Sequence, residues 1–421
     1  MSERPTPAKL APTRTPAFEA RLKKRYAAEM RFKYAGMGAV LLSVAVLLFL
    51  LVSMAMDGIG GFQRAELRVS VDFSATALSV NPSLTDANAQ IRSLESQGLP
   101  DIVSFAAQQT LGEEAAAELN TEAWRSVASQ IAADPAAMQG TQEFWLPASE
   151  DLASALSGDG KAELQPLAQQ LAADGLLDER FDPGFMLRSD ATDPQLAGIW
   201  GALKGSILTM IVTLSLAFPI GVLAALYLEE YAPKNRWTEV IEVSINNLAA
   251  VPSIIFGLLG LVVFLKWGGF PRSSALVGGM TLALMTMPVI VISGRNAIKA
   301  VPPSIRDGAL AIGASKVQVV FHHVLPLALP GILTGTIIGM ARALGETAPL
   351  LLIGMRAFIS TPPDGLTDNA TVLPMQIFLW SDEIDRGFVE RTSAAIIVLL
   401  VFLLLMNGLA IYLRNRFEKR W

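Results

Sequence analysis

Cysteine is absent from the 421-residue sequence, and histidine occurs only twice, as the neighbours His322 and His323. The absence of cysteine excludes disulfide scaffolds, thiolate zinc sites and cysteine nucleophiles, while two adjacent histidines point to different helix faces and make a poor metal site. Charge is scarce as well, because only 17% of the residues are charged, against about 25% in ordinary soluble domains. With 52% hydrophobic residues, the composition predicts an integral membrane protein with neither a metal site nor redox chemistry.

The few charges are unevenly distributed along the chain. Residues 57–196 contain 22 acidic and 7 basic side chains, a net charge of −15, although the whole chain carries only −5. The remaining residues therefore carry +10 and form a basic, hydrophobic frame around one acidic insert. No face rich in Lys and Arg with interleaved aromatic residues is present in the sequence, which argues against nucleic-acid binding.

Uninterrupted runs without charge predict six membrane-spanning helices, because a hydrocarbon core of about 30 Å needs about 20 apolar residues. These runs are 34–56, 205–228, 243–265, 273–294, 317–341 and 392–413. The fifth is expected to enter the membrane near Pro326 and to continue past Arg342 to about Leu352. A cleaved signal peptide is the alternative for the first run, but 23 uncharged residues exceed the usual apolar region of about 7–15.

The distribution of Lys and Arg around the runs predicts the orientation. Residues 1–33 contain nine of them, and the tail 414–421 contains four, so both termini are expected in the cytoplasm. Six spans satisfy this condition and place the basic loop 295–316 on the same side. The acidic insert 57–196 then lies outside, where a long domain is translocated largely regardless of its charge.

The acidic insert is predicted to be a small α+β domain. Leu67, Val69, Val71 and Phe73 alternate along residues 65–73 as in a half-buried strand. Residues 113–133 and 162–177 have helical composition and spacing, and Gly175 is expected to stop the second helix. No nucleophile and base cluster in it, and a charge of −15 repels anions. We therefore expect a docking or spacer domain, with a sensory or catalytic role as the alternative, and predict no site in it.

The loop 300–331 contains the most specific pattern in the chain. Pro302 and Pro303 are typical of a helix start, and small residues follow, so that a short helix could bring its backbone close to a partner surface. The pattern consists of Asp307, Gly308, Ala309, Gly313, Leu325 and Pro326. It predicts a docking face; a tight turn between two spans is the alternative.

This pattern resembles the EAA-x3-G-x9-I-x-LP signature of binding-protein-dependent ABC importer permeases, with Asp307-Gly308-Ala309 in place of EAA and His323 in place of Ile. The resemblance covers residues 200–413 and implies that 300–323 is the coupling loop that sits in a groove of an ATPase subunit. The sequence contains no G-x4-G-K-[ST] motif. ATP and Mg²⁺ are therefore expected on a separate ATPase partner, and this chain is expected to be a transport subunit that is not an enzyme and holds no cofactor.

The fifth run also contains a charged pair, Arg342 and Glu346, beside a stripe of small residues that favours close helix packing: Gly331, Gly335, Gly339 and Ala343. A membrane-embedded arginine costs about 2.5–3.5 kcal/mol on insertion scales, and a guanidinium fork matches the oxygens of an oxyanion. The pair is therefore predicted to lie on the substrate pathway, with a self-neutralising structural ion pair as the alternative. Arg295 is a second pathway candidate, but at a membrane boundary it could serve only as an anchor.

The segments 342–354, 373–380 and 392–401 narrow the resemblance to PstA-type permeases of phosphate importers, in the form with an extra N-terminal exterior domain. That family implies phosphate as cargo, the Arg342–Glu346 pair as its intramembrane pair, and the bacterial inner membrane as the location. It implies as partners a homologous PstC-type permease, two PstB-type ATPases, a periplasmic phosphate-binding protein and membrane lipid. Another oxyanion (sulfate, molybdate or phosphonate) and a membrane-anchored sensor remain alternatives.

The expected fold is accordingly an all-α polytopic membrane protein with an N-terminal anchor, a five-helix permease core and an α+β periplasmic domain inserted between the first two helices. The expected segments are a basic cytoplasmic N-terminus, the first transmembrane helix, the periplasmic domain, the permease core and a basic cytoplasmic tail, at 1–33, 34–56, 57–196, 197–413 and 414–421.

Overall fold

The computed structural model describes residues 16–74, 76, 78–80, 87–158, 160–356, 358–385 and 387–417. It divides into two compact units, residues 1–56 and 57–421, which we treat separately. The first 15 residues of the predicted cytoplasmic N-terminus and residues 418–421 of the predicted tail lie outside the described residues.

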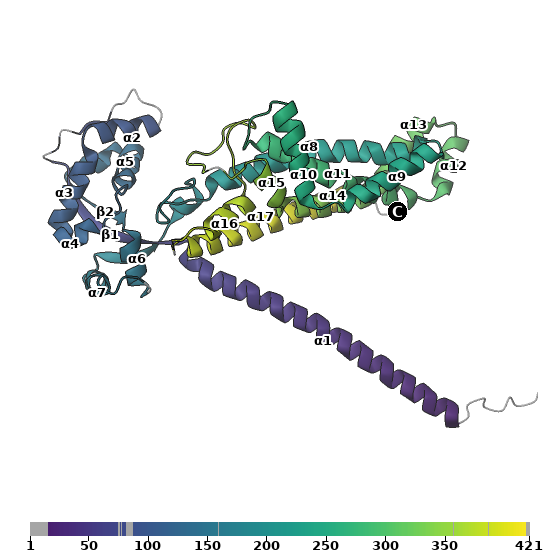
Figure 1. The fold of residues 1–421 in the computed structure, drawn as a ribbon, viewed down its shortest axis with the longest axis horizontal. Coiled ribbons are helices and arrows are strands. Elements are labelled where there is room, and N and C mark those ends of the chain that lie inside the picture. The colour runs from purple at the N-terminus through teal and green to yellow at the C-terminus, as the bar shows by residue number, and fades with distance from the viewer. Residues whose placement is uncertain are drawn as a thin grey trace, which may run out of the picture. The chain divides into compact units, whose positions relative to one another are not determined.

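Helix α1 (Pro16–Gly60) contains the first predicted span and the basic segment before it in one continuous helix (Figure 1). Proline occurs only at its first position, and the rest is rich in Ala, Leu, Val and Met, so nothing in the sequence interrupts the helix. The residues from Ala20 to Gly60 are long and apolar enough to cross a membrane.

The acidic insert is an α+β domain, as predicted. Its antiparallel sheet has the order β2-β1-β3, with β1 (Gln63–Asp72) between β2 (Thr141–Pro147) and β3 (Leu177–Phe181), and Leu67 pairs with Leu146 on one side and Leu177 on the other. Its helices and 3-10 turns are α2 (Ala87–Ser96), α3 (Leu99–Leu111), α4 (Glu113–Ala117), α5 (Trp124–Ala133), η1 (Pro135–Met138), α6 (Glu150–Leu156), α7 (Gln165–Ala173) and η2 (Pro183–Met186).

The predicted strand at 65–73 is confirmed, but the helix predicted over 113–133 was wrong in its length. The chain leaves the helical path after Ala117, because Leu119 bridges to Ala148 and the Asn120 N–H donates to the Pro147 carbonyl at the end of β2. The helix predicted within 162–177 is α7, which begins at Gln165 and ends before Gly175, the glycine expected to stop it; the φ of Gly175 is +69°, which favours glycine.

The second unit continues with a helical core, in the region that is expected to be the permease core. Its elements are α8 (Trp200–Leu226), η3 (Tyr227–Tyr231), α9 (Arg236–Ala249), α10 (Ser253–Gly260), η4 (Leu261–Trp267), α11 (Ala275–Lys299), α12 (Pro303–Ala311), α13 (Lys316–Val319), η5 (Val320–Val324), α14 (Leu325–Leu344), α15 (Ala348–Leu352), α16 (Leu373–Ser381) and α17 (Gly387–Phe417). The segments η3, η4 and η5 are π-helical turns.

Two predicted spans differ from the structure. The run 243–265 is not one straight helix, because the chain bends by 103° between α9 and the α10–η4 segment, where Pro252 cannot donate a backbone hydrogen bond. The fifth span does not continue to Leu352: α14 ends at Leu344, and Gly345–Thr347 separate it from α15. Five described helices can cross a membrane by length and composition, and the bent pair makes six.

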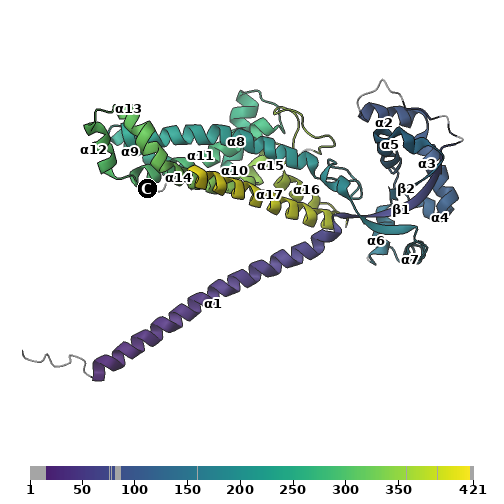
Figure 2. The same ribbon diagram turned by 180° about the vertical axis from the view of Figure 1, so that it is seen from behind.

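Helix α11 lies at the centre of the core, between α8 and α14. The small residues of α14 lie directly against it: a Cβ built on Gly331 would lie 2.6 Å from Ala297 Cβ, and one on Gly339 would lie 2.8 Å from a Thr286 methyl. In both views α12 and α13 lie at the same end of the helices as the end of α17 (Figures 1 and 2). The acidic domain contacts the opposite end of α17, where Glu150 Oε1 accepts a 3.1 Å hydrogen bond from the Gly387 N–H.

Candidate functional site

The predicted docking loop forms two short helices joined at Gly313, whose φ is +92°. Asp307, Gly308 and Gly313 are exposed, whereas Ala309 is buried and holds α12 onto the core. Ser315 begins α13 with a reciprocal capping box to Gln318. The signature therefore separates into an exposed part and an anchoring part.

The exposed part of the loop is also apolar. It exposes large apolar side chains that a soluble loop would bury. Ile312 is 83% exposed, and Leu310, Val317 and Phe321 of the same loop are also exposed. A Cβ on Gly308 would meet nothing within 4 Å, so the backbone of α12 is open to close approach. The surface thus combines exposed small and apolar residues, as a protein-docking face requires. Leu325 and Pro326, half-buried, begin α14 behind it.

Arginine side chains connect the helix ends beside this loop. Arg306 of α12 pairs with Glu230 of η3, with its Nη2 2.8 Å from Oε1. Arg295 of α11 pairs with Glu229 of η3 at 2.5 Å and with Glu242 of α9 at 2.8 Å. Four helices are joined by these pairs. These pairs were not predicted from the sequence, because glutamates at the boundary of an uncharged run mark the end of a span and carry no sign of their partners.

Arg342 and Glu346 form the predicted i,i+4 contact, with Nε 3.4 Å from Oε1. Glu346 lies beyond the end of α14, so the pair bridges the break before α15. The Arg342 side chain is 47% exposed, and its two terminal nitrogens contact no other described carboxylate. Its guanidinium fork is therefore accessible on a surface of α14 that the described residues leave partly uncovered.

Arg295 is in a different situation from Arg342. It is buried, and Nε and Nη2 are each paired with a carboxylate. Because Gly339 lies against Thr286 and Gly331 against Ala297, the two arginines are roughly 15 Å apart along the helix axes. The structure does not bring the three pathway candidates together, and their role stays a prediction.

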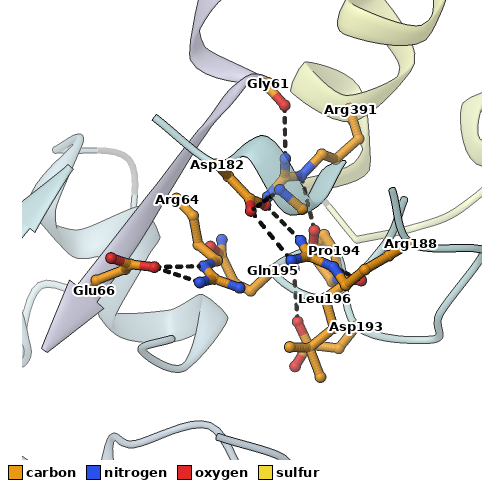
Figure 3. Close-up of polar contacts among 11 residues, drawn as sticks. Gly61, Arg64, Glu66, Asp182, Arg188, Asp193, Pro194, Gln195, Leu196 and Arg391 are labelled. Atoms are coloured by element: carbon orange, nitrogen blue, oxygen red, sulfur yellow. Dashed lines mark hydrogen bonds and ion pairs between the residues drawn. The ribbon is translucent and has the colours of Figure 1, made fainter. Parts of the chain in front are cut away.

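A second buried polar cluster lies where the acidic domain meets α17 (Figure 3). Arg391 is only 3% exposed; its Nε donates to the Pro194 carbonyl at 2.8 Å and its Nη1 to the Gly61 carbonyl at 2.6 Å. Its Nη2 lies 3.8 Å from Asp182 Oδ2, and its guanidinium lies 5.3 Å from the Phe185 ring centre. Arg391 therefore holds three separate chain segments to the first turns of α17.

Asp182 connects this cluster to Arg188, which donates to both carboxylate oxygens at 3.1 and 2.5 Å. Burial alone would raise the pKa of Asp182, but the hydrogen bond and charge of Arg188, with the charges of Arg64 and Arg391, outweigh it and lower this pKa below its usual value. Asp182 is thus ionised near neutral pH. This stretch belongs to the insert, in which no site was predicted, and no local signal in the sequence identifies the cluster.

Comparison with known proteins agrees with the expected family and the helical fold. Residues 217–420 match the family described as binding-protein-dependent transport system inner membrane component. The phosphate transport system permease protein PstA 1 of Mycobacterium tuberculosis is 33% identical over 218 residues, which are 51% of this chain and 70% of that protein. This chain belongs to the PstA-type permeases. The predicted ABC-transporter membership and the polytopic helical fold are thereby confirmed.

Other relatives are similar to this PstA-type chain over comparable lengths. PstA of Yersinia pestis is 33% identical over 51% of this chain and 71% of its own length. The probable ABC transporter permease protein YqgI of Bacillus subtilis is 33% identical over 43% of this chain and 61% of its own length. Among solved structures, a chain of the inward-facing MetNI methionine ABC transporter covers 52% of this chain at 18% identity, with a TM-score of 0.42. Residues 19–166 match a domain of unknown function, DUF3333. This range covers most of the first helix and most of the acidic domain.

Proposed function

We propose that this PstA-type permease imports inorganic phosphate into the cytoplasm, driven by ATP hydrolysis on partner subunits. The choice of phosphate is supported by the relatives named phosphate transport system permeases, which are 33% identical to this chain over 51% of its length. The coupling to ATP is supported by the exposed small and apolar face of α12 and α13, which fits the groove of an ATPase subunit. ATP and Mg²⁺ bind on those partners in this proposal, and this chain contributes no cofactor.

The partners in this proposal are a PstC-type permease, two PstB-type ATPases and a periplasmic phosphate-binding protein. The loop with α12 and α13 and the end of α17 face the cytoplasm, and the acidic domain faces the periplasm. The basic residues of α1 and of the end of α17 support this orientation through the positive-inside bias. Both termini are then cytoplasmic.

In the transport cycle, ATP binding closes the partner ATPases and displaces α12, and the spans rock from outward-facing to inward-facing around a path beside α14. The free terminal nitrogens of Arg342 attract the phosphate dianion for a short time, and Glu346 keeps this attraction from becoming tight. Arg295, whose nitrogens are occupied by two glutamates, positions helices and does not contact the cargo.

The test is uptake of labelled phosphate by the purified complex in proteoliposomes with candidate binding proteins. We expect uptake that depends on internal ATP and that arsenate inhibits but sulfate does not. Inhibition by sulfate or molybdate would reassign the cargo to another oxyanion. Purification without any ATPase subunit, together with no ATP-dependent uptake, would favour the sensor alternative.

A further inference from the structure

Hydrophobic packing attaches α12 only weakly to the helices that span the membrane. It is nine residues long, and among its described side chains only Ala309 is buried, while Ile305 packs partly against the same cluster. Yet the proposed mechanism requires that movement of this helix be transmitted to the spans. A stronger connection than one alanine is needed for that.

Arg306 supplies such a connection. Its Nε and Nη2 lie 3.1 and 2.8 Å from Glu230 Oε1, its Nη1 donates to the Val301 carbonyl at 2.6 Å, and its Nη2 also donates to the Ile298 carbonyl at 2.9 Å. The Ile298 carbonyl belongs to the last turn of α11, and Val301 follows the end of this helix. A positive charge is favourable there because helix carbonyls at this end lack partners. The guanidinium of Arg306, which belongs to α12, thus binds both the end of α11 and the end of α8.

The partner glutamate stands in a second network. Glu230 follows Glu229 within the π-helical turn η3, which directly continues α8. Glu229 binds Arg295 of α11, and Arg295 binds Glu242 of α9. Displacing Arg306 therefore pulls on α8 and α11 directly, and on α9 through Arg295. These charged groups are largely buried, with 22% exposure for Arg306 and 13% for Glu230, so solvent screens them much less than a surface pair.

We propose that Arg306 and Glu230 are the positioning pair that transmits movement of α12 to α8 and α11, so that ATP hydrolysis on the partner drives rocking of the spans. This inference rests on the proposed function, because it assigns a residue pair to its coupling step. Neither residue contacts the cargo. Loss of the pair leaves the docking face and the substrate path in place but disconnects them.

The experiment uses the whole complex in proteoliposomes and measures three quantities: ATPase subunit bound, ATP hydrolysed and phosphate taken up. Arg306→Gln and Glu230→Gln are expected to retain the ATPase subunit and to hydrolyse ATP, while uptake per ATP falls about tenfold. The double variant is expected to fall no further, since both changes break one interaction. Arg306→Lys, which keeps the charge but loses the fork, should retain an intermediate ratio.

Arg236→Gln is the matched control, because Arg236 lies at the start of α9, is exposed, and makes no ion pair within the described residues. An unchanged ratio of uptake to ATP in the assembled Arg306 and Glu230 variants would overturn the proposal, as would effects that add in the double variant or loss of the ATPase subunit. Absence of ATP-dependent uptake in the unmodified complex would instead refute the proposed function.

A structural measurement separates the inference from transport activity. Since the chain has no cysteine, cysteines for spin labels can be introduced without others in this subunit. Suitable exposed positions are Ser304 at the start of α12, which is not one of the apolar side chains of the docking face, and Trp237 on α9. In the unmodified protein the distance between labels should stay constant when ATP is trapped, because the elements move together. In Arg306→Gln the distance between the labels should shift or its distribution should broaden. An unchanged distribution in this variant would contradict the proposed role of the Arg306–Glu230 pair.

Discussion

Close packing of α14 on α11 predicts a large effect of one methyl group at Gly335. A Cβ there would lie 1.8 Å from Ser293 Oγ and 2.1 Å from Ser293 Cβ, distances that no rotamer of serine can relieve because Cβ does not move with χ1. Gly335→Ala must therefore separate the helices. Overpacking of this kind costs about 1–3 kcal/mol, which corresponds to a fall of about 2–12 °C in melting temperature for a core of this size.

The same contacts also predict a second substitution that should compensate for the clash. Replacing Ser293 by glycine removes both clashing atoms, and the nearest remaining atom is Ser293 Cα at 3.6 Å, an ordinary van der Waals distance. Gly335→Ala combined with Ser293→Gly should thus recover most of the lost stability. Gly408→Ala in α17 is the matched control, because a Cβ there meets nothing within 4 Å.

Thermal unfolding of the purified complex, followed by size-exclusion chromatography, measures these differences. Phosphate uptake of the same variants shows whether the altered helix contact also disturbs the path beside Arg342. The reasoning about packing is refuted if Gly335→Ala melts at the temperature of the unmodified protein, or if Ser293→Gly worsens it further instead of rescuing it.

Three further predictions concern the charged residues. Arg342→Gln should abolish most phosphate uptake while the complex assembles normally; uptake at the unmodified rate would leave a structural ion pair as its only role. Arg391→Met should destabilise the junction by about 3–5 kcal/mol, because it leaves buried partners uncompensated, and faster proteolysis after α1 would report it. The lowered pKa of Asp182 means that its ionised form stabilises the fold above the unfolded pKa of about 3.8, and that this contribution disappears as pH falls through the lower folded value. Unfolding measured between pH 7 and 3 should therefore show an acid loss that Asp182→Asn lacks, whereas equal slopes in both proteins would contradict the assignment.

The junction around Arg391 gives the acidic domain a defined attachment to the transporter. Arg391 donates hydrogen bonds to the carbonyls of Gly61, which precedes β1, and of Pro194, which lies in the segment leading to α8. The domain is therefore held at both of its connections to the membrane part. The negative charge of the insert sets its solubility, but these buried contacts determine which span it is attached to. Its match to a domain of unknown function leaves this mechanical attachment as its best-defined property.

Local properties of the sequence were sufficient for much of the fold. The number of spans, the strand at 65–73, the α+β class of the insert and the family all follow from features within about 30 consecutive residues, where hydrophobicity and spacing act directly on the backbone. The small residues of α14 could be recognised in the same way, and their spacing placed them on one helix face before any partner was known.

The tertiary structure decided everything that depends on residues distant in the chain. Glu229 and Glu230 meet arginines 66 and 76 positions away, and Arg391 reaches a carbonyl 330 positions away. The bend at Pro252 and the end of α14 at Leu344 were also decided by the tertiary structure. An uninterrupted apolar run shows that a segment prefers lipid to water, but it does not determine where the helix bends or ends. Charged residues look alike in sequence, and only folding determines whether a guanidinium stays largely exposed, as in Arg342, or becomes bound between helices, as in Arg295 and Arg306.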